Sequence, residues 1–271
     1  MTDLIQVLII AVAQGIGEFL PISSSGHNAL INRLFEMFGN PLTKDGAEFL
    51  KLNILLHLGS LIAVLIVFRH RIAGLFVKER RLILMLGIAS IPIAVVGLPI
   101  YMYAPWTQNN MPLVSACFLV TGLMLLLTLR FPEGKMLTST MTCKQAFFIG
   151  CAQGLAVLPG ISRLGATFAA GLWCGLNREE ATAFSFILSI PVIVGSGMAT
   201  CINMLRESPL TDGGTLPGGL LLLGATVSCM AGIVTLLFFL DWVKKDKLWY
   251  FAIWVFAGWV FLMSPITLLL A

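Results

Sequence analysis

The chain has 271 residues, of which 58% are hydrophobic and only 11% are charged, and its mean hydropathy is +0.94. An ordinary soluble domain carries roughly 25% charged residues, so this composition excludes a soluble enzyme and also a disordered chain. Long unbroken apolar runs favour a polytopic helical membrane protein over a barrel of short alternating strands. The formal net charge of +4 is small, and we therefore expect no nucleic acid as a partner.

Two kinds of apolar segment alternate along the chain. Residues 4–35 and 145–176 are interrupted by proline, serine, glycine and polar side chains, so each predicts two half-length helices that meet at a turn, a re-entrant hairpin. Such broken backbone survives inside a membrane only where protein or a water-filled cavity surrounds it, and the two hairpins should therefore line the functional site. Six other stretches are long enough to span roughly 30 Å of hydrocarbon: Phe49–Phe68, Leu82–Ala104, Pro112–Leu129, Ala181–Ile202, Leu216–Leu240 and Leu248–Ala271.

The two hairpins resemble each other in sequence. Ala13-Gln14-Gly15-Ile16 is matched by Ala152-Gln153-Gly154-Leu155, and Leu20-Pro21-Ile22-Ser23 is matched by Leu158-Pro159-Gly160-Ile161-Ser162. We therefore predict one membrane domain, 1–271, built from repeat one (1–130) and repeat two (145–271). Each repeat is a hairpin followed by three spans, and because three is odd the second repeat should enter the membrane from the opposite side, as in inverted-repeat transporters.

Basic residues indicate the orientation. They gather in the segments 69–81, 130–144 and 241–247, which all fall on one side of this topology, whereas segments 105–111 and 203–215 hold one arginine between them. The basic side is predicted to be cytoplasmic. Both chain ends and the opening of the first hairpin would then face the exterior, and the two hairpin tips would meet near the midplane.

Glu18 is the only carboxylate amid apolar sequence in the first fifty residues. An acid at membrane depth is costly and is therefore a functional hypothesis by default. Gln14 lies four residues earlier, on the same face of the half-helix. The pair predicts a metal ligand or base at Glu18, or else a hydrogen bond that only holds the hairpin together.

A turn formed by Ser23, Ser24, Ser25, Gly26 and His27 follows this acid. It offers hydroxyls, backbone N–H groups and an imidazole, and the start of the next half-helix favours an anion. A serine-rich turn that merely caps the helix is the alternative. With an acid so near, we expect a phosphate site.

Arg163 is the sole charged residue between positions 145 and 177. A guanidinium in that setting needs an anionic partner, either Glu18 or a phosphate that it can hold with two hydrogen bonds. One hairpin thus brings an acid, hydroxyls and an imidazole, and the other brings a cation, which suits phosphoryl chemistry. Gln153 and His57 are weaker candidates that would support the site, and an interhelical hydrogen bond explains His57 equally well.

The run from Gln14 to His27 (QGIGEFLPISSSGH) and the run from Pro159 to Thr167 (PGISRLGAT) resemble the two signature motifs of the bacterial undecaprenyl pyrophosphate phosphatase family, the bacitracin-resistance type. Leu56–Val64 and Phe184–Pro191 are similar to further segments of that family, so the resemblance extends over nearly the whole chain. It implies a bacterial inner-membrane enzyme that removes the terminal phosphate of undecaprenyl pyrophosphate and so recycles the carrier lipid of peptidoglycan synthesis.

The resemblance also implies roles for individual residues. Gln14 and Glu18 would bind an assisting divalent cation, Mg²⁺ or Ca²⁺; Ser24 would be a candidate nucleophile and His27 the acid or base. Phosphate contacts are implied for Ser23, Ser25, Gly26, Gly160, Ser162, Arg163 and Thr167.

Three positions depart from the family pattern. Gln14 stands where many members carry a second glutamate, Leu164 replaces a common serine, and Asn53 occupies a position where an acid is frequent. The first change lowers the negative charge offered to a cation, and the second removes a hydroxyl from the phosphate loop.

The sequence therefore predicts an α-helical inverted-repeat membrane enzyme that hydrolyses a polyprenyl diphosphate at a pocket open to the exterior, with the lipid tail between spans. The nucleophile is either Ser24 or a metal-bound water. A transporter or flippase of a lipid phosphate, built on the same repeat, is the alternative function. Formation of a homodimer is left open.

Overall fold

The computed structural model describes residues 2–39, 42, 46–77, 79–97, 99, 107, 110–130, 134–206, 216–245 and 248–263, and it is helical almost throughout them. The β-structure of these residues is one isolated bridge, between Met136 and Leu176. The helices are α1 (Thr2–Phe19), α2 (Ser24–Met37), α3 (Gly46–Val67), α4 (Arg69–Val77), α5 (Arg80–Pro92), the π-helix η1 (Ile93–Gly97), α8 (Met111–Leu127), the 3₁₀ turns η2 (Thr128–Arg130) and η3 (Thr138–Thr140), α9 (Cys143–Leu155), α10 (Arg163–Trp173), α11 (Arg178–Arg206), α12 (Gly218–Val243) and α13 (Trp249–Leu262).

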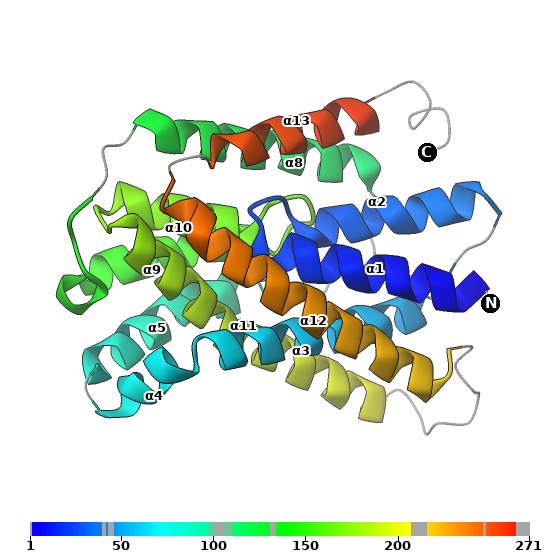
Figure 1. The fold of residues 1–271 in the computed structure, drawn as a ribbon, viewed down its shortest axis with the longest axis horizontal. Coiled ribbons are helices and arrows are strands. Elements are labelled where there is room, and N and C mark those ends of the chain that lie inside the picture. The colour runs from blue at the N-terminus through cyan, green and yellow to red at the C-terminus, as the bar shows by residue number, and fades with distance from the viewer. Residues whose placement is uncertain are drawn as a thin grey trace.

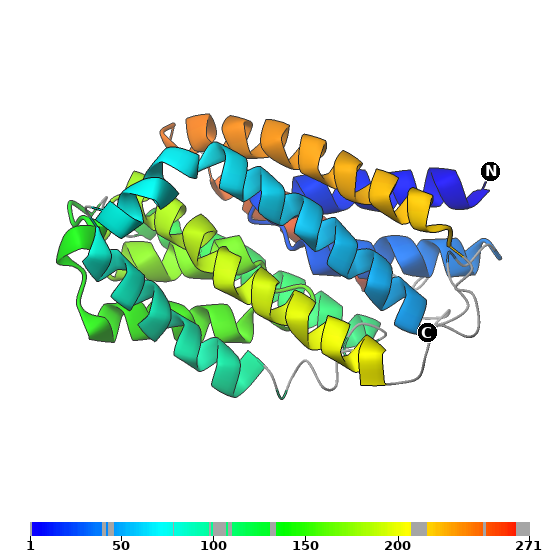
Figure 2. The same cartoon turned by 90° about the horizontal axis from the view of Figure 1, so that it is seen from below.

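The longer helices run along the length of an elongated bundle (Figures 1 and 2). The hairpin α1–α2 opens towards the end of the bundle where α1 begins, and the hairpin α9–α10 opens towards the opposite end, where α4 and the start of α9 lie (Figure 1). Their tips meet in the middle of the bundle, where α1 contacts α10. Both predicted helical hairpins are thus present, and each is built from two half-length helices.

Several helices are suited to a membrane. Within the described residues, four helical segments are long and apolar enough to cross one, and the bent pair α3–α4 makes a fifth. In the most apolar stretch of α12 only 28% of the residues are buried inside the protein, so most of its apolar surface faces outward. Apolar surface of that extent belongs in lipid rather than in water. The chain is therefore a multi-pass, all-helical membrane protein.

The predicted six spans are only partly reproduced. The first predicted span ends at Phe68, and α3 ends one residue earlier, at Val67. The chain then continues as α4, bent by 77° from α3, where the sequence predicts a basic loop. The second is an α-helix only as far as Pro92, whose missing N–H interrupts the regular ladder, and it goes on as the π-helix η1. The last predicted span contains α13, which has 14 residues, and residues 264–271 lie outside the described part.

Close packing against α12 holds α1 and α3 in place. A Cβ atom added at Gly59 of α3 would lie 2.2 Å from the carbonyl oxygen of Ala225, so only glycine permits this approach. Nearby, the hydroxyls of Ser60 and Ser228 lie 3.2 Å apart and form a buried hydrogen bond between the same two helices. These contacts fix α3, which carries His57, against α12.

Candidate active site

Ser23 joins the tips of the two hairpins. Its Oγ caps α2 by accepting a hydrogen bond from the backbone N–H of Gly26 at 3.3 Å, and it accepts a second from the N–H of Gly160 in the other tip at 3.1 Å. Among the described residues, Ser23 is the one non-glycine residue with a positive φ, 68°. A side chain in that conformation costs on the order of 1–3 kcal/mol and persists only where surrounding contacts enforce it, which here are the two backbone amides.

Helix α8 supports the second tip. Gly160 has φ +100°, and a Cβ atom there would lie 2.4 Å from the carbonyl oxygen of Val114. Thr121 of α8 donates to the carbonyl oxygen of Gly160 at 2.8 Å and accepts from the N–H of Ser162 at 3.0 Å. Sequence analysis did not single out Thr121, because a lone hydroxyl in an apolar span is a weak signal.

Glu18 is the centre on which the predicted residues converge. Its Oε2 accepts from Ser24 Oγ at 2.7 Å and from Gln14 Nε2 at 3.2 Å, and its Oε1 accepts from Arg163 Nη1 at 3.2 Å. His57 Nε2 lies 3.7 Å from Oε2. The Glu18 side chain is only 9% exposed, and a carboxylate so buried needs these donors to remain ionised. Five of the sequence candidates are thereby brought together from α1, α2, α3 and α10.

Ser24 is placed to act as a nucleophile. A hydroxyl within 2.6–3.2 Å or so of a carboxylate can pass its proton to that base as it attacks. Ser24 is also the first residue of α2, where unpaired N–H groups and the helix dipole favour negative charge on its oxygen. The contact and the position in α2 are those that a serine nucleophile requires.

A second layer of amides orients the groups around Glu18. Asn28 Nδ2 donates to Gln14 Oε1 at 2.8 Å, which turns the Gln14 Nε2 towards the carboxylate. His57 Nδ1 donates to the carbonyl oxygen of Asn53 at 2.7 Å, which leaves Nε2 facing Glu18. Asn53, which stands where the family resemblance leads one to expect an acid, therefore contributes a backbone oxygen to this layer.

His27 points elsewhere. Its Nδ1 donates to the carbonyl oxygen of Ser23 at 2.8 Å, and its Nε2 accepts from the indole N–H of Trp254 at 3.0 Å. Its ring also packs edge-on against Phe118, with the ring centroids 5.2 Å apart. In this arrangement His27 links the first hairpin tip to α13, and its role as acid or base stays a prediction.

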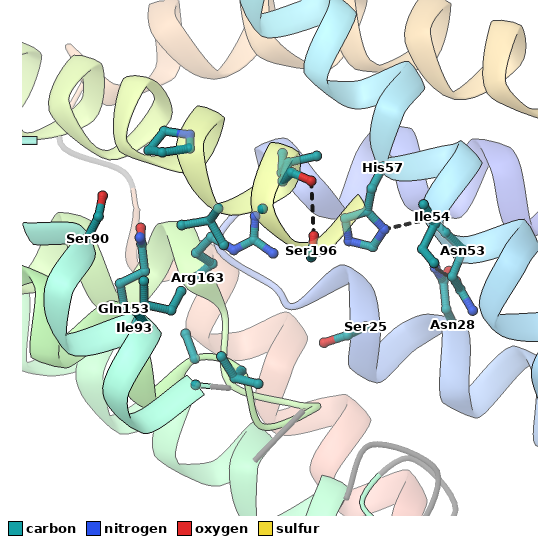
Figure 3. A pocket seen from close by; sticks show the side chains of 18 of the residues that line it. Ser25, Asn28, Asn53, Ile54, His57, Ser90, Ile93, Gln153, Arg163 and Ser196 are labelled. Carbon is teal, nitrogen blue, oxygen red and sulfur yellow. Dashed lines mark hydrogen bonds between the residues drawn. The ribbon is translucent and has the colours of Figure 1, made fainter. Parts of the chain in front are cut away.

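Two hollows that share lining residues lie near the carboxylate. The larger has a volume of about 470 Å³ and a mostly apolar wall (Figure 3). The smaller, of about 30 Å³, is lined by Glu18 and Ser24. Arg163, His57 and Ser25 line both. We call the larger one the main cavity and the smaller one the recess. The polar side chains of the main cavity are Ser25, Asn28, Asn53, His57, Ser90, Gln153, Arg163 and Ser196.

The predicted phosphate contacts divide into two groups. Ser23, Ser25, Ser162 and Arg163 line the recess. Neither hollow is lined by Gly26, Gly160 or Thr167. The N–H groups of the two glycines donate to Ser23 Oγ, and the Thr167 hydroxyl donates to the carbonyl oxygen of Arg163 at 2.9 Å. In this arrangement the second group shapes the two tips.

The side chains present do not form a ligand set for a resident cation. Within the described part of the chain there is no group of three or more histidine, cysteine, aspartate or glutamate side chains that could hold a metal ion. Glu18 is the single carboxylate in the recess and already faces Arg163, while the Gln14 oxygen is turned towards Asn28. A hard cation prefers several oxygen ligands, which these residues alone do not supply.

Comparison with known proteins gives one consistent result. The family described as bacitracin resistance protein BacA matches residues 7–260. An undecaprenyl-diphosphatase of Rhodopirellula baltica is 37% identical over 252 residues, which are 93% of this chain and 94% of the relative. Undecaprenyl-diphosphatases of Desulfosudis oleivorans and Carboxydothermus hydrogenoformans are 38% and 35% identical and cover 80% and 91% of this chain. On this similarity, which spans almost its full length, the chain belongs to the bacitracin resistance protein BacA family.

Proposed function

We propose that the protein is an undecaprenyl-diphosphatase, which hydrolyses the lipid diphosphate to the lipid monophosphate and inorganic phosphate. The observation that carries this proposal is the junction of Ser24, Glu18 and Arg163. Ser24, the nucleophile, is hydrogen-bonded to its base Glu18, and both residues line the recess. Arg163 lines both the recess and the main cavity. The arrangement suits a ligand with an anionic head and an apolar tail.

The reaction proceeds in two displacements at the terminal phosphorus. Ser24 Oγ forms a bond to that phosphorus while its proton passes to Glu18, and the bond to the bridging oxygen breaks, so that the lipid monophosphate leaves. The departing monophosphate takes that proton from Glu18. Water then attacks the phosphoserine and gives a proton to Glu18, which passes it to Ser24 Oγ as the bond to phosphorus breaks, so that phosphate and free Ser24 are released. This route favours Ser24 over a metal-bound water as nucleophile because the hydroxyl and its base are already in contact.

Arg163 has two successive partners in this scheme. In the free protein it neutralises Glu18, with a side chain that is 25% exposed and can therefore move towards a ligand. When the diphosphate enters, its oxygens compete for the guanidinium and gain two parallel hydrogen bonds. When Arg163 turns towards the phosphate, Glu18 Oε1 is released from the ion pair while Oε2 keeps its hydrogen bond from Ser24, so the base stays in contact with the nucleophile.

The main cavity accommodates only part of the substrate. A volume of about 470 Å³ holds a ligand of ordinary drug size, which corresponds to the diphosphate and the first isoprenoid units. The rest of the long tail would leave between helices into the surrounding lipid. An assisting divalent cation remains part of the proposal only as a partner of the phosphates.

We further propose the arrangement in the membrane that the sequence predicts. The two hairpins would be the re-entrant parts of an inverted repeat with six spans, in a bacterial inner membrane. The basic segments would be cytoplasmic, and the site would open to the exterior. The opposite openings of the two hairpins support this topology (Figure 1). Formation of a homodimer stays an open prediction.

The test is release of inorganic phosphate from undecaprenyl diphosphate by the purified protein in detergent. Ser24→Ala should abolish release and also the labelled phosphoprotein that forms when the terminal phosphate carries the label. Ser185→Ala is the matched control, because Ser185 is a buried serine that lines neither hollow and donates to the carbonyl oxygen of Ala181 in the same helix, α11. A wild-type protein that moves lipid phosphates across vesicles but releases no phosphate would make it a transporter and refute the proposal.

A further inference from the structure

Gln153 of α9 is a fully buried amide to which no described residue is hydrogen-bonded. Its side chain is 0% exposed, and neither Nε2 nor Oε1 has a hydrogen bond within the described part of the chain. Two unsatisfied polar atoms lower the stability of the folded state, and an apolar side chain of the same size would avoid that loss. Gln153 also lines the main cavity, so a ligand there can supply what the protein does not.

The counterpart of Gln153 in the first hairpin, Gln14, has hydrogen-bond partners for its side-chain amide. Gln14 donates to Glu18 at 3.2 Å and accepts from Asn28 at 2.8 Å, so both of its polar atoms are satisfied. In the second hairpin the position that matches Glu18 is Val157, which has no polar side-chain atom. The second hairpin therefore retains the amide of Gln153 but not the acid that would bind it.

The positions of the two hollows indicate which part of a diphosphate Gln153 can reach. Ser24 lines the recess, so the outer phosphorus must react there; Gln153 lines only the main cavity. Arg163 lines both and lies between Gln153 on one side and His57 on the other in the view of Figure 3. The phosphate next to the lipid must then lie in the main cavity, beside Arg163.

We propose that Gln153 binds the inner phosphate of the substrate, the one that stays on the lipid, by donating a hydrogen bond from Nε2. This inference rests on the proposed phosphatase function and adds a residue that distinguishes the lipid-bound phosphate from the one released. A neutral donor suits this position, because a second fixed cation would also hold the monophosphate product strongly. Within the described lining of the two hollows, Arg163 is the single arginine or lysine.

The test uses the full-length protein in detergent, with farnesyl diphosphate as substrate and farnesyl monophosphate and inorganic phosphate as competing inhibitors. Gln153→Met keeps the length of the side chain and removes both polar atoms. One hydrogen bond to a charged oxygen corresponds to about a 10- to 100-fold effect. We expect KM and the inhibition constant of farnesyl monophosphate to rise by about that factor, while inhibition by inorganic phosphate and the melting temperature do not fall.

Gln14→Met is the structural comparison, because its amide is bonded within the protein and its loss should lower the melting temperature. Three results would overturn the inference: unchanged KM in folded Gln153→Met, equal weakening of both inhibitors, or loss of folding in both Gln153→Met and Gln153→Leu. The last would show that the amide is structural. Failure of the phosphatase function itself would look different, since the wild-type protein would then release no phosphate at all.

Discussion

Removal of Arg163 is the perturbation that tests the site most directly. Its guanidinium lies 3.2 Å from Glu18, and it is the single arginine or lysine in the described lining of the two hollows. Arg163→Ala therefore deletes the positive charge that would face the transferring phosphate. Arg163→Lys keeps the charge but loses the two-pronged geometry, so it should recover only part of the activity.

The expected size of the effect of Arg163→Ala differs between the free protein and the transition state. In the free protein Glu18 keeps its hydrogen bonds from Ser24 and Gln14, so the stability lost with one charge-assisted hydrogen bond is about 1.5–3 kcal/mol. In the transition state no other cation of the site can take over. Loss of such preorganised stabilisation is on the order of 3–5 kcal/mol, or a fall of ~10²–10⁴ in turnover.

The assay is the rate of phosphate release, measured beside the melting temperature of the same preparation. Arg71→Ala is the matched control: Arg71 pairs with Glu180 at 2.6 Å, is 26% exposed and lines neither hollow. It should lower stability by a similar amount and leave turnover nearly unchanged. If folded Arg163→Ala protein kept most of its turnover, as the control does, the arginine would be structural and our placement of the phosphates would be wrong.

Three further predictions concern the tip, the cation and the topology. Gly160→Ala should lower the melting temperature far more than Gly175→Ala, because both glycines have positive φ but only at Gly160 would a Cβ atom meet backbone, at 2.4 Å; equal losses would show that φ alone matters. Gln14→Glu should make phosphate release more sensitive to a chelator than in the wild type, since a second carboxylate attracts a divalent cation. If the chelator affected neither protein, Glu18 would have a proton-transfer role only. Cys143, exposed at the start of α9, should resist a membrane-impermeant thiol reagent in intact cells and react after lysis, with Cys143→Ser as the blank; reaction from outside would contradict the proposed topology.

The hairpins and the residues around Glu18 could be predicted because the signal is local. A proline or serine that interrupts an apolar run is visible in sequence, and a buried charge needs an opposite partner, which limits Glu18 to very few choices. The pairing of Glu18 with Arg163, across 145 positions, follows from that scarcity. Side-chain direction has no such signal. His27 belongs to the same motif as Ser24, yet it turns towards Trp254, because direction depends on which helix packs behind the turn.

The helix ends were less predictable than the hairpins. Composition cannot distinguish a helix that continues after a sharp bend from one that stops, so it predicts a loop where α4 lies. Nor does it show that α5 goes on after Pro92 as the π-helix η1, of which Ile93, Ala94 and Gly97 line the main cavity. Thr121 was missed for a related reason: its two hydrogen bonds to the second tip exist only once α8 has packed against α10.

The bridge at Ser23 also bears on how the protein is made. The serine that joins the tips is synthesised well over a hundred residues before its partner, since its bond to Gly160 spans 137 positions. Until the second hairpin has left the ribosome and entered the bilayer, the first hairpin holds Glu18 and the strained turn at Ser23 without their later partners. These partners are the guanidinium of Arg163 and the N–H of Gly160. A nascent chain released too early would thus lack both the amide that holds Ser23 and the cation that faces Glu18. Assembly of the reactive centre therefore waits for the second hairpin, so that phosphate-cleaving activity arises only in chains whose two hairpins have both been inserted.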